Sequence, residues 1–425
     1  MAAAPVLEVR DVSMAFSRAG GAPLEVLSHI TLSLQAGEIV GLLGRSGSGK
    51  STLLRLIAGL LRPTSGEVVF EGRPVTNPPA HLAMVFQTFA LFPWLSVLQN
   101  VEVGLDALGI PQELTRKKAS EAIKMIGLDG FESAFPRELS GGMRQRVGFA
   151  RALVIEPLLM LMDEPFSALD VLTAETLRTD FLDLWQSGHM PTRAVLLVTH
   201  NIEEAVLFCD RIFVLAPNPG RIATEVAVGL PQPRERQDPA FHGGVDCLYA
   251  ALTARGRAEA GAGAATDVLP SVTLAAMTRL LETVARPPWS GEAALADLTA
   301  RRVLHPGDVL AAADALERLG FAELKEGRIR LTAAAGVFVQ GEREERKRLF
   351  REHLLRFVPL AAHMHAILRE RKTHRAPRTR FESELEDRLT RPDAQRTLET
   401  LTAWGRYADL FAFDARTRDF KLPAE

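Results

Sequence analysis

The chain has 425 residues, enough for two or three domains that each bury a core, and a formal net charge of −2 with 24% charged residues. This balance gives no sign of a polyanion-binding or disordered protein. Cys209 and Cys247 are the only cysteines and lack the spacing of a zinc or redox site, which fits a reducing cytosol. We expect no secretory signal and no stretch of the roughly 18 apolar residues needed to cross a bilayer. A role at a membrane would therefore depend on a partner.

Residues 6–230 alternate short β-rich runs with helical patterns. This alternation is typical of βαβ units around a largely parallel sheet. Four continuous apolar runs predict buried strands, at residues 38–43, 158–162, 194–198 and 211–215. The first three lead into loops with functional residue types, so we expect an α/β domain over residues 1–230 with its site at the strand ends.

The rest of the chain predicts a linker and a second domain. Residues 231–270 are rich in Pro, Ala and Gly and predict a connection with little core of its own. Residues 271–425 predict a mainly helical domain. In it, residues 315–324 resemble residues 400–410, each a helix that stops at Gly, meets an aromatic and enters a hairpin. Two tandem winged-helix-like units are predicted, with chance similarity as the alternative.

A phosphate-binding loop is predicted by the sequence GRSGSGKS, which fits GxxxxGK[ST] between a buried strand and a helix. Its glycines let backbone N–H groups converge on phosphate oxygens, and the helix N-terminus adds positive potential there. We expect Lys50 to reach the β- and γ-phosphates and Ser51 to ligate Mg²⁺. The alternative is a Gly-rich turn that binds nothing. The predicted ATP-binding residues of this loop are Gly44, Arg45, Ser46, Gly47, Ser48, Gly49, Lys50, Ser51 and Thr52.

Two adjacent acids, Asp163 and Glu164, follow the buried strand 158–162. Ligand sites in parallel sheets open at the carboxyl ends of strands. There Asp163 would hold Mg²⁺, and Glu164 would act as general base on the attacking water. Without a phosphate loop, an ordinary acidic helix N-cap would be the better interpretation.

The run Leu139-Ser140-Gly141-Gly142-Met143 resembles the signature of ABC ATPases. The resemblance implies a P-loop ATPase domain with a mostly parallel sheet, an antiparallel β subdomain and a helical signature subdomain. It also implies that the signature completes the ATP site of a partner subunit. A Ser-Gly-Gly turn that opens a helix is suited to bind an anion. The residues expected to contact ATP in trans are Ser140, Gly141, Gly142 and the D-loop Asp170.

The other family positions occur in the expected order. By resemblance, Gln87 is the Q-loop residue that links nucleotide and magnesium to the membrane partner, and His200 contacts the γ-phosphate. Phe16 matches the aromatic that stacks on adenine, although Tyr is more usual there. The predicted catalytic residues are thus Glu164, His200 and Gln87, and the predicted magnesium ligands are Ser51, Gln87 and Asp163.

Met143 at the end of the signature, together with residues 91–97, resembles the nitrate, sulfonate, taurine and bicarbonate importer branch of the family. The tail resembles the AAA-associated C-terminal domain. The resemblance implies a translocase-class ATPase that uses ATP and Mg²⁺ as a dimer. It also implies a separate permease, an indirect solute-binding protein, and a location on the cytoplasmic face of the inner membrane.

Two other functions remain as alternatives. A soluble ABC ATPase of translation or DNA repair would usually carry tandem cassettes or long coiled coils, which the sequence lacks. A tail that binds nucleic acid for regulation would use the basic run between residues 369 and 380. A solvated loop is the plainer interpretation of that run, because acids are interleaved with the basic residues of the tail.

Overall fold

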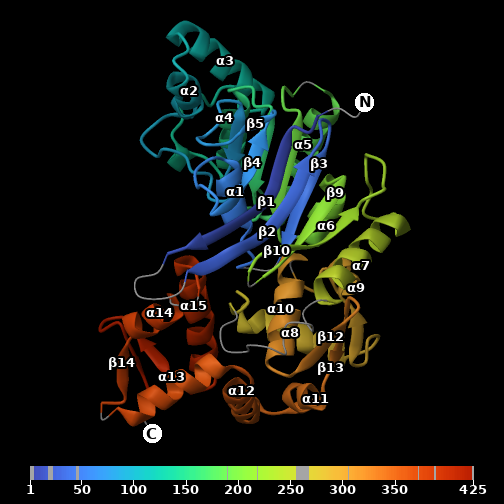
Figure 1. Cartoon of the computed structure of the whole chain (residues 1–425). Helices are drawn as coiled ribbons and strands as arrows, with labels where there is room; N and C mark the ends of the chain where they lie inside the picture. The colour runs from blue at the N-terminus through green and yellow to red at the C-terminus, as the bar shows by residue number, and fades with distance from the viewer. Residues whose placement is uncertain are drawn as a thin grey trace.

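The computed structural model describes residues 4–17, 23–44, 47–188, 190–217, 219–254, 268–304, 306–371, 373–386 and 389–423. It contains an α/β domain followed by a mainly helical tail that packs under one end of it (Figure 1). In these parts of the chain no helix is both long and apolar enough to cross a membrane.

A four-stranded antiparallel sheet lies at the N-terminal side of the first domain, in the order β2-β1-β4-β5. The apolar face of this sheet is buried. Phe16 is the last residue of β1 that pairs with β2. The antiparallel subdomain expected from the family resemblance is therefore present. Its strands are β1 (Leu7–Phe16), β2 (Leu24–Leu34), β4 (Ser65–Phe70) and β5 (Arg73–Pro74).

A six-stranded sheet in the order β10-β9-β3-β8-β7-β6 forms the centre of the domain. All its pairs are parallel except β10 with β9. β3 and β8 are buried along their whole length, because helices and the other sheet cover both faces. The four predicted strands are confirmed to within a residue at their ends. The strands are β3 (Ile39–Gly44), β6 (Leu82–Val85), β7 (Leu159–Asp163), β8 (Ala194–Thr199), β9 (Arg211–Ala216) and β10 (Arg221–Ala227).

The helices of this domain form two groups. Three follow strands of the central sheet: α1 (Lys50–Ile57), α5 (Val171–Gln186) and α6 (Ile202–Phe208). Another three pack on one another as a helical subdomain, at the end of the molecule away from the tail (Figure 1). These are α2 (Val97–Ala107), α3 (Gln112–Met125) and α4 (Gly141–Leu153), and a 3-10 turn (Pro136–Glu138) precedes the last. The mostly parallel sheet and helical subdomain agree with the predicted fold class.

The range expected as a linker, 231–270, contains the helix α7 (Pro239–Ala254). Phe241, Val245, Leu248 and Leu252 are buried at helical spacing, and Tyr249 donates or accepts a 2.7 Å hydrogen bond with Thr299 of the tail. The high content of small residues around this face concealed it in the sequence. The Ala/Gly-rich residues 255–267 lie outside the described residues.

The tail contains two small sheets with the same strand order. β11-β13-β12 and β14-β16-β15 each place the last strand between the other two, and each hairpin follows a long helix, α10 or α15. The strands are β11 (Glu292–Ala294), β12 (Ala322–Lys325), β13 (Arg328–Leu331), β14 (Arg375–Pro377), β15 (Ala412–Asp414) and β16 (Asp419–Lys421). The helices are α8 (Leu274–Ala285), α9 (Leu295–Ala300), α10 (Pro306–Arg318), α11 (Ala333–Gln340), α12 (Arg343–Phe357), α13 (Pro359–Glu370), α14 (Arg378–Glu386) and α15 (Arg391–Tyr407).

Arg234 holds the segment that leaves the first domain. Its guanidinium donates to the carbonyls of Val206 at 2.7 Å and Cys209 at 2.6 Å, at the C-terminal end of α6, and to Leu230 at 2.9 Å. The side chain is only 2% exposed. A buried cation suits this position because the carbonyls at a helix C-terminus lack partners within the helix.

We expect Arg234→Ala to lower the free energy of unfolding by about 3 kcal/mol, because three carbonyls lose their donor. Scanning calorimetry of the purified chain measures the change. Arg73→Ala, at an exposed position of β5, is the control and should stay within about 0.5 kcal/mol of the wild type. Equal melting temperatures for both variants would contradict this role for Arg234.

Candidate functional site

The phosphate loop connects β3 to α1 at the carboxyl end of the central sheet. A Cβ at Gly44 would lie 2.7 Å from Ser48 Oγ and 2.9 Å from Leu215 O, so only glycine fits there. Gly49 caps α1 with a φ of 89°, in the left-handed region that favours glycine. The structure thus gives local reasons for two glycines of the motif. Arg45 and Ser46 lie outside the described residues.

Lys50 is buried, and its Nζ donates to Gly44 O at 2.7 Å. Burial lowers the pKa of this ammonium, and the charges of Glu164 and Asp163 oppose that effect. Ser48 Oγ is also buried, and it has no hydrogen-bond partner among the described residues. A buried cation beside an unsatisfied hydroxyl fits a site for phosphate oxygens.

Asp163 ends β7 beside Ser51, the first residue after the lysine. Burial raises the pKa of Asp163, and the neighbouring charge of Glu164 raises it further, whereas a hydrogen bond with Ser51 opposes the shift. A hard cation prefers oxygen ligands of this kind and would remove the repulsion between the two carboxylates. The residues present therefore fit Mg²⁺: Ser51 and Asp163 would hold it, with Gln87 of the same cavity as the third predicted ligand.

Glu164 has a φ of 47°, a strained value for a residue with a side chain. Its Oε2 accepts a hydrogen bond from Gln87 Nε2 at 3.2 Å and lies 3.1 Å from His200 Nδ1. Burial alone would raise the pKa of Glu164, but the hydrogen bond and charge of His200, with Lys50, outweigh it and lower the pKa. The pKa of His200 is raised in turn by Glu164 despite its burial. Glu164 therefore stays ionised, as a general base requires.

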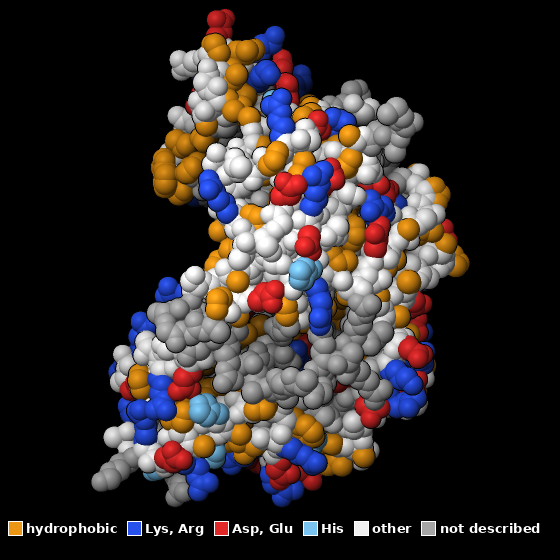
Figure 2. Space-filling view, viewed as in Figure 1, with side chains coloured by type: hydrophobic (Ala, Val, Ile, Leu, Met, Phe, Trp, Pro, Cys, Tyr) orange, Lys and Arg blue, Asp and Glu red, His pale blue; other side chains and the backbone are white. Residues whose placement is uncertain are grey.

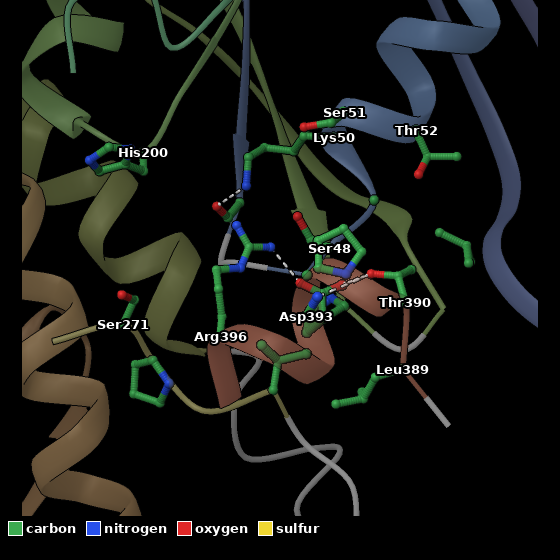
Figure 3. A pocket seen from close by; sticks show the side chains of 18 of the residues that line it. Ser48, Lys50, Ser51, Thr52, His200, Ser271, Leu389, Thr390, Asp393 and Arg396 are labelled. Atoms are coloured by element: carbon green, nitrogen blue, oxygen red, sulfur yellow. Dashed lines mark hydrogen bonds and ion pairs between the residues drawn. The ribbon is translucent and has the colours of Figure 1, made fainter. Parts of the chain in front are cut away.

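These residues share one cavity of about 970 Å³ (Figure 3). Residues predicted from distant parts of the sequence line it together, including the aromatic at the end of β1. The predicted site residues in its wall are Phe16, Gly44, Gly47, Ser48, Gly49, Lys50, Ser51, Thr52, Gln87, Asp163, Glu164 and His200.

The signature residues lie elsewhere. Ser140 caps α4 by accepting from Met143 N at 3.3 Å, and Asp170 caps α5 by accepting from Thr173 N at 3.0 Å. Hydrogen bonds from the side chain and the backbone of Thr173 lower the pKa of Asp170. The described residues that line the cavity do not include Ser140, Gly141, Gly142 or Asp170. The structure thus separates the residues expected to act in trans from those of the chain's own site.

The tail contributes to the same cavity, which the sequence did not predict. α10 supplies Asp308, Asp314 and Arg318, and the start of α15 supplies Asp393 and Arg396. In the sequence, the only signal at these positions is Thr390 followed three residues later by Asp393, a helix-capping pattern.

Comparisons with known proteins agree with this geometry. Residues 27–167 match the family model described as ABC transporter, and residues 297–414 match the C-terminal AAA-associated domain. The chain is 45% identical over 229 residues to the nitrate import ATP-binding protein of Synechocystis sp.. This alignment covers 54% of this chain and 85% of the relative. The chain is 44% identical over 240 residues to a taurine import ATP-binding protein of Burkholderia pseudomallei, covering 55% of this chain and 91% of the relative.

A solved dimeric ATP-binding cassette in a post-hydrolysis state bound to ADP and Pi is 32% identical, with a TM-score of 0.47. It covers 53% of this chain and 100% of that chain. The two sequence relatives are matched over most of their own length, and the matched region holds the phosphate loop, Gln87, the acidic pair and the signature. The chain therefore belongs to the family of ABC transporter ATP-binding proteins.

Proposed function

We propose that this chain is the ATPase subunit of an ABC importer, hydrolysing MgATP at the interface of two nucleotide-binding domains. The observation that carries the proposal is the single cavity that joins the phosphate loop to the ionised Glu164 and its neighbours Gln87 and His200. The relatives, named as import ATP-binding proteins, support the importer assignment.

The chain's residues divide the chemistry of phosphoryl transfer to water. Lys50 and the backbone of the phosphate loop hold the β- and γ-phosphates. Glu164 accepts the proton of the attacking water, and His200 holds the γ-phosphate and orients Glu164 through Nδ1. Ser51, Gln87 and Asp163 would hold Mg²⁺, and the bound ion would supply positive charge that neutralises the phosphates. The water oxygen forms a bond to the γ-phosphorus as the bond from the β–γ bridging oxygen to that phosphorus breaks, giving ADP and phosphate.

A second subunit is part of the proposal because the signature lies outside the cavity of its own chain. Ser140, Gly141, Gly142 and Asp170 would meet ATP bound to the partner, most simply a second copy of this chain. The helix N-terminus that Ser140 caps supplies unpaired N–H groups for phosphate oxygens.

An apolar surface next to Gln87 supports contact with a permease. The rings of Phe92 and Trp94 contact each other with centres 5.6 Å apart and planes tilted by 51°, although Trp94 is 70% exposed and Phe92 37%. Figure 2 shows hydrophobic side chains gathered over the loop beside α2. Exposed aromatic clusters of this kind mark protein contacts. The chain would therefore lie on the cytoplasmic face of the inner membrane, attached through the permease.

The solute that we propose is a small anion such as nitrate, sulfonate, taurine or bicarbonate, delivered by a solute-binding protein that contacts the permease. The relatives' names support this class. We propose the division into residues 1–230, 231–270 and 271–425, with α7 as a structured part of the connection.

The nucleic-acid alternative loses support in the tail's basic run. Arg378 pairs with Glu382 at 2.5 Å and Arg380 pairs with Glu384 at 3.0 Å. These i,i+4 pairs place an acid beside both of these arginines, whereas a phosphate-binding surface would keep its cations clear of acids. We therefore propose that the tail regulates or braces the ATPase.

We expect Glu164→Gln to leave ATP binding intact and to lower turnover on the order of 10³-fold, about 4 kcal/mol of barrier, because only the base is lost. Lys50→Ala should instead weaken ATP binding. Steady-state phosphate release and equilibrium titration with MgATP separate the two effects. Glu113→Gln, at an exposed site on α3, is the control. Wild-type turnover by the Glu164 variant would contradict its role as base.

We expect MgATP to dimerise the Glu164→Gln variant, since slow hydrolysis leaves ATP bound between the subunits. Light scattering with and without MgATP measures the mass. In a sharper test, Lys50→Ala and Ser140→Arg chains are mixed, and the mixed dimer should recover activity at one of its two composite sites. No recovery at any mixing ratio would argue against shared sites.

A further inference from the structure

The nucleotide cavity is closed on one side by the tail of the same chain. Figure 3 shows the start of α15 facing the phosphate loop, with Asp393 near Ser48 and Arg396 directed toward Lys50. Ser271 and the beginning of α10 complete this wall. About 345 residues separate Asp393 and Arg396 from the phosphate loop in sequence, so the fold alone brings them together.

Two glycines lie close to side chains across the boundary between the tail and the first domain. A Cβ at Gly47 would lie 2.8 Å from Val268 Cγ2 and 3.4 Å from Asp393 Oδ1. A Cβ at Gly307 would lie 2.5 Å from His200 Nε2, so glycine allows α10 to approach the histidine. The tail therefore touches both the phosphate loop and the residue that follows β8.

Arg396 is the tail residue that faces the phosphate-binding groups. Its Nη2 lies 2.5 Å from Asp393 Oδ1, and its side chain, which lines the cavity, is 46% exposed. Burial is the main cause that lowers the pKa of Lys50, and the charge of Arg396 lowers it further. Two cations that face one cavity repel each other, and an anion bound between them would remove that repulsion.

Asp393 has a separate structural reason for its place. It is the third residue of α15, its backbone N–H donates to Thr390 Oγ1 at 3.4 Å, and Thr390 Oγ1 donates to its Oδ2 at 2.6 Å. This helix cap orients the carboxylate that pairs with Arg396. Among the described residues, the guanidinium forms its ion pair with Asp393, which a phosphate can replace, and its charge also acts on Glu164.

We propose that Arg396 is a phosphate-binding residue that the tail supplies to the nucleotide site of its own chain. The polyphosphate of ATP replaces Asp393 as the partner of the guanidinium, whose planar fork matches phosphate oxygens. The cavity of about 970 Å³ leaves room for a nucleotide with the tail in place. This inference rests on the proposed ATP binding and adds a residue that lies outside the ABC domain.

The test measures how the full chain binds a non-hydrolysable ATP analogue with Mg²⁺, by isothermal titration calorimetry. Arg396→Ala should weaken binding about tenfold, equivalent to 1.4 kcal/mol. Arg396→Lys, which keeps the charge without the fork, should lose less. AMP should bind both variants as it binds the wild type, because Arg396 faces Lys50 and hence the β- and γ-phosphates. Arg406→Ala, at an exposed position late in α15, is the matched control.

Asp393→Asn gives the opposite expectation: tighter binding of the analogue by several-fold, because the competing carboxylate charge is gone.

Equal affinity for wild type, Arg396→Ala and Arg406→Ala would overturn the inference. Tighter binding by Arg396→Ala would also overturn it, and would mean that the Arg396–Asp393 pair excludes nucleotide. Failure of the wild type itself to bind, with Lys50→Ala no weaker, would instead overturn the proposed function. Melting temperatures of each variant show that the fold is retained.

Discussion

Parallel pairing of β3, β8 and β7 is the constraint on which the site depends. β8 pairs with β3 through Leu43 and Thr199, and with β7 through Asp163 and Val198. This register brings the phosphate loop, the acidic pair and His200 to one edge of the sheet, although they are far apart in sequence. Because β3 and β8 are buried on both faces, a shift of register would disrupt the packing of both cores, so the core fixes the positions of the site residues.

The sequence predicted the ABC domain well for a physical reason. Buried parallel strands are continuous apolar runs, and the phosphate loop needs glycines at fixed positions, so both leave local signals. Gln87 and His200 both contact Oε2 of Glu164. The family resemblance, through the order of these residues along the chain, had indicated that they share one site. The strained backbone at Glu164 had no signal of its own in the sequence.

The tail was harder to predict because its important contacts are long-range. α7 was expected to be a linker, since its buried face is interspersed with Ala and Gly. Arg396 looks like an ordinary helical cation with an acid three residues before it, and only the packing of the tail on the first domain places it beside Lys50. A local sequence pattern cannot predict a contact that depends on how two domains are placed relative to each other.

The shared wall of the cavity also joins two binding equilibria. α7 of the connection and α10 of the tail pack against α6, the helix that follows His200, so the tail and the nucleotide site are parts of one packed structure. Suppose that a molecule binds the tail, moves α15 and thereby changes the affinity for ATP by some factor. By thermodynamic linkage, ATP then changes the affinity of the tail for that molecule by the same factor. With ATP bound beside α15 as proposed, the binding of ATP and the binding of a ligand to the tail are coupled.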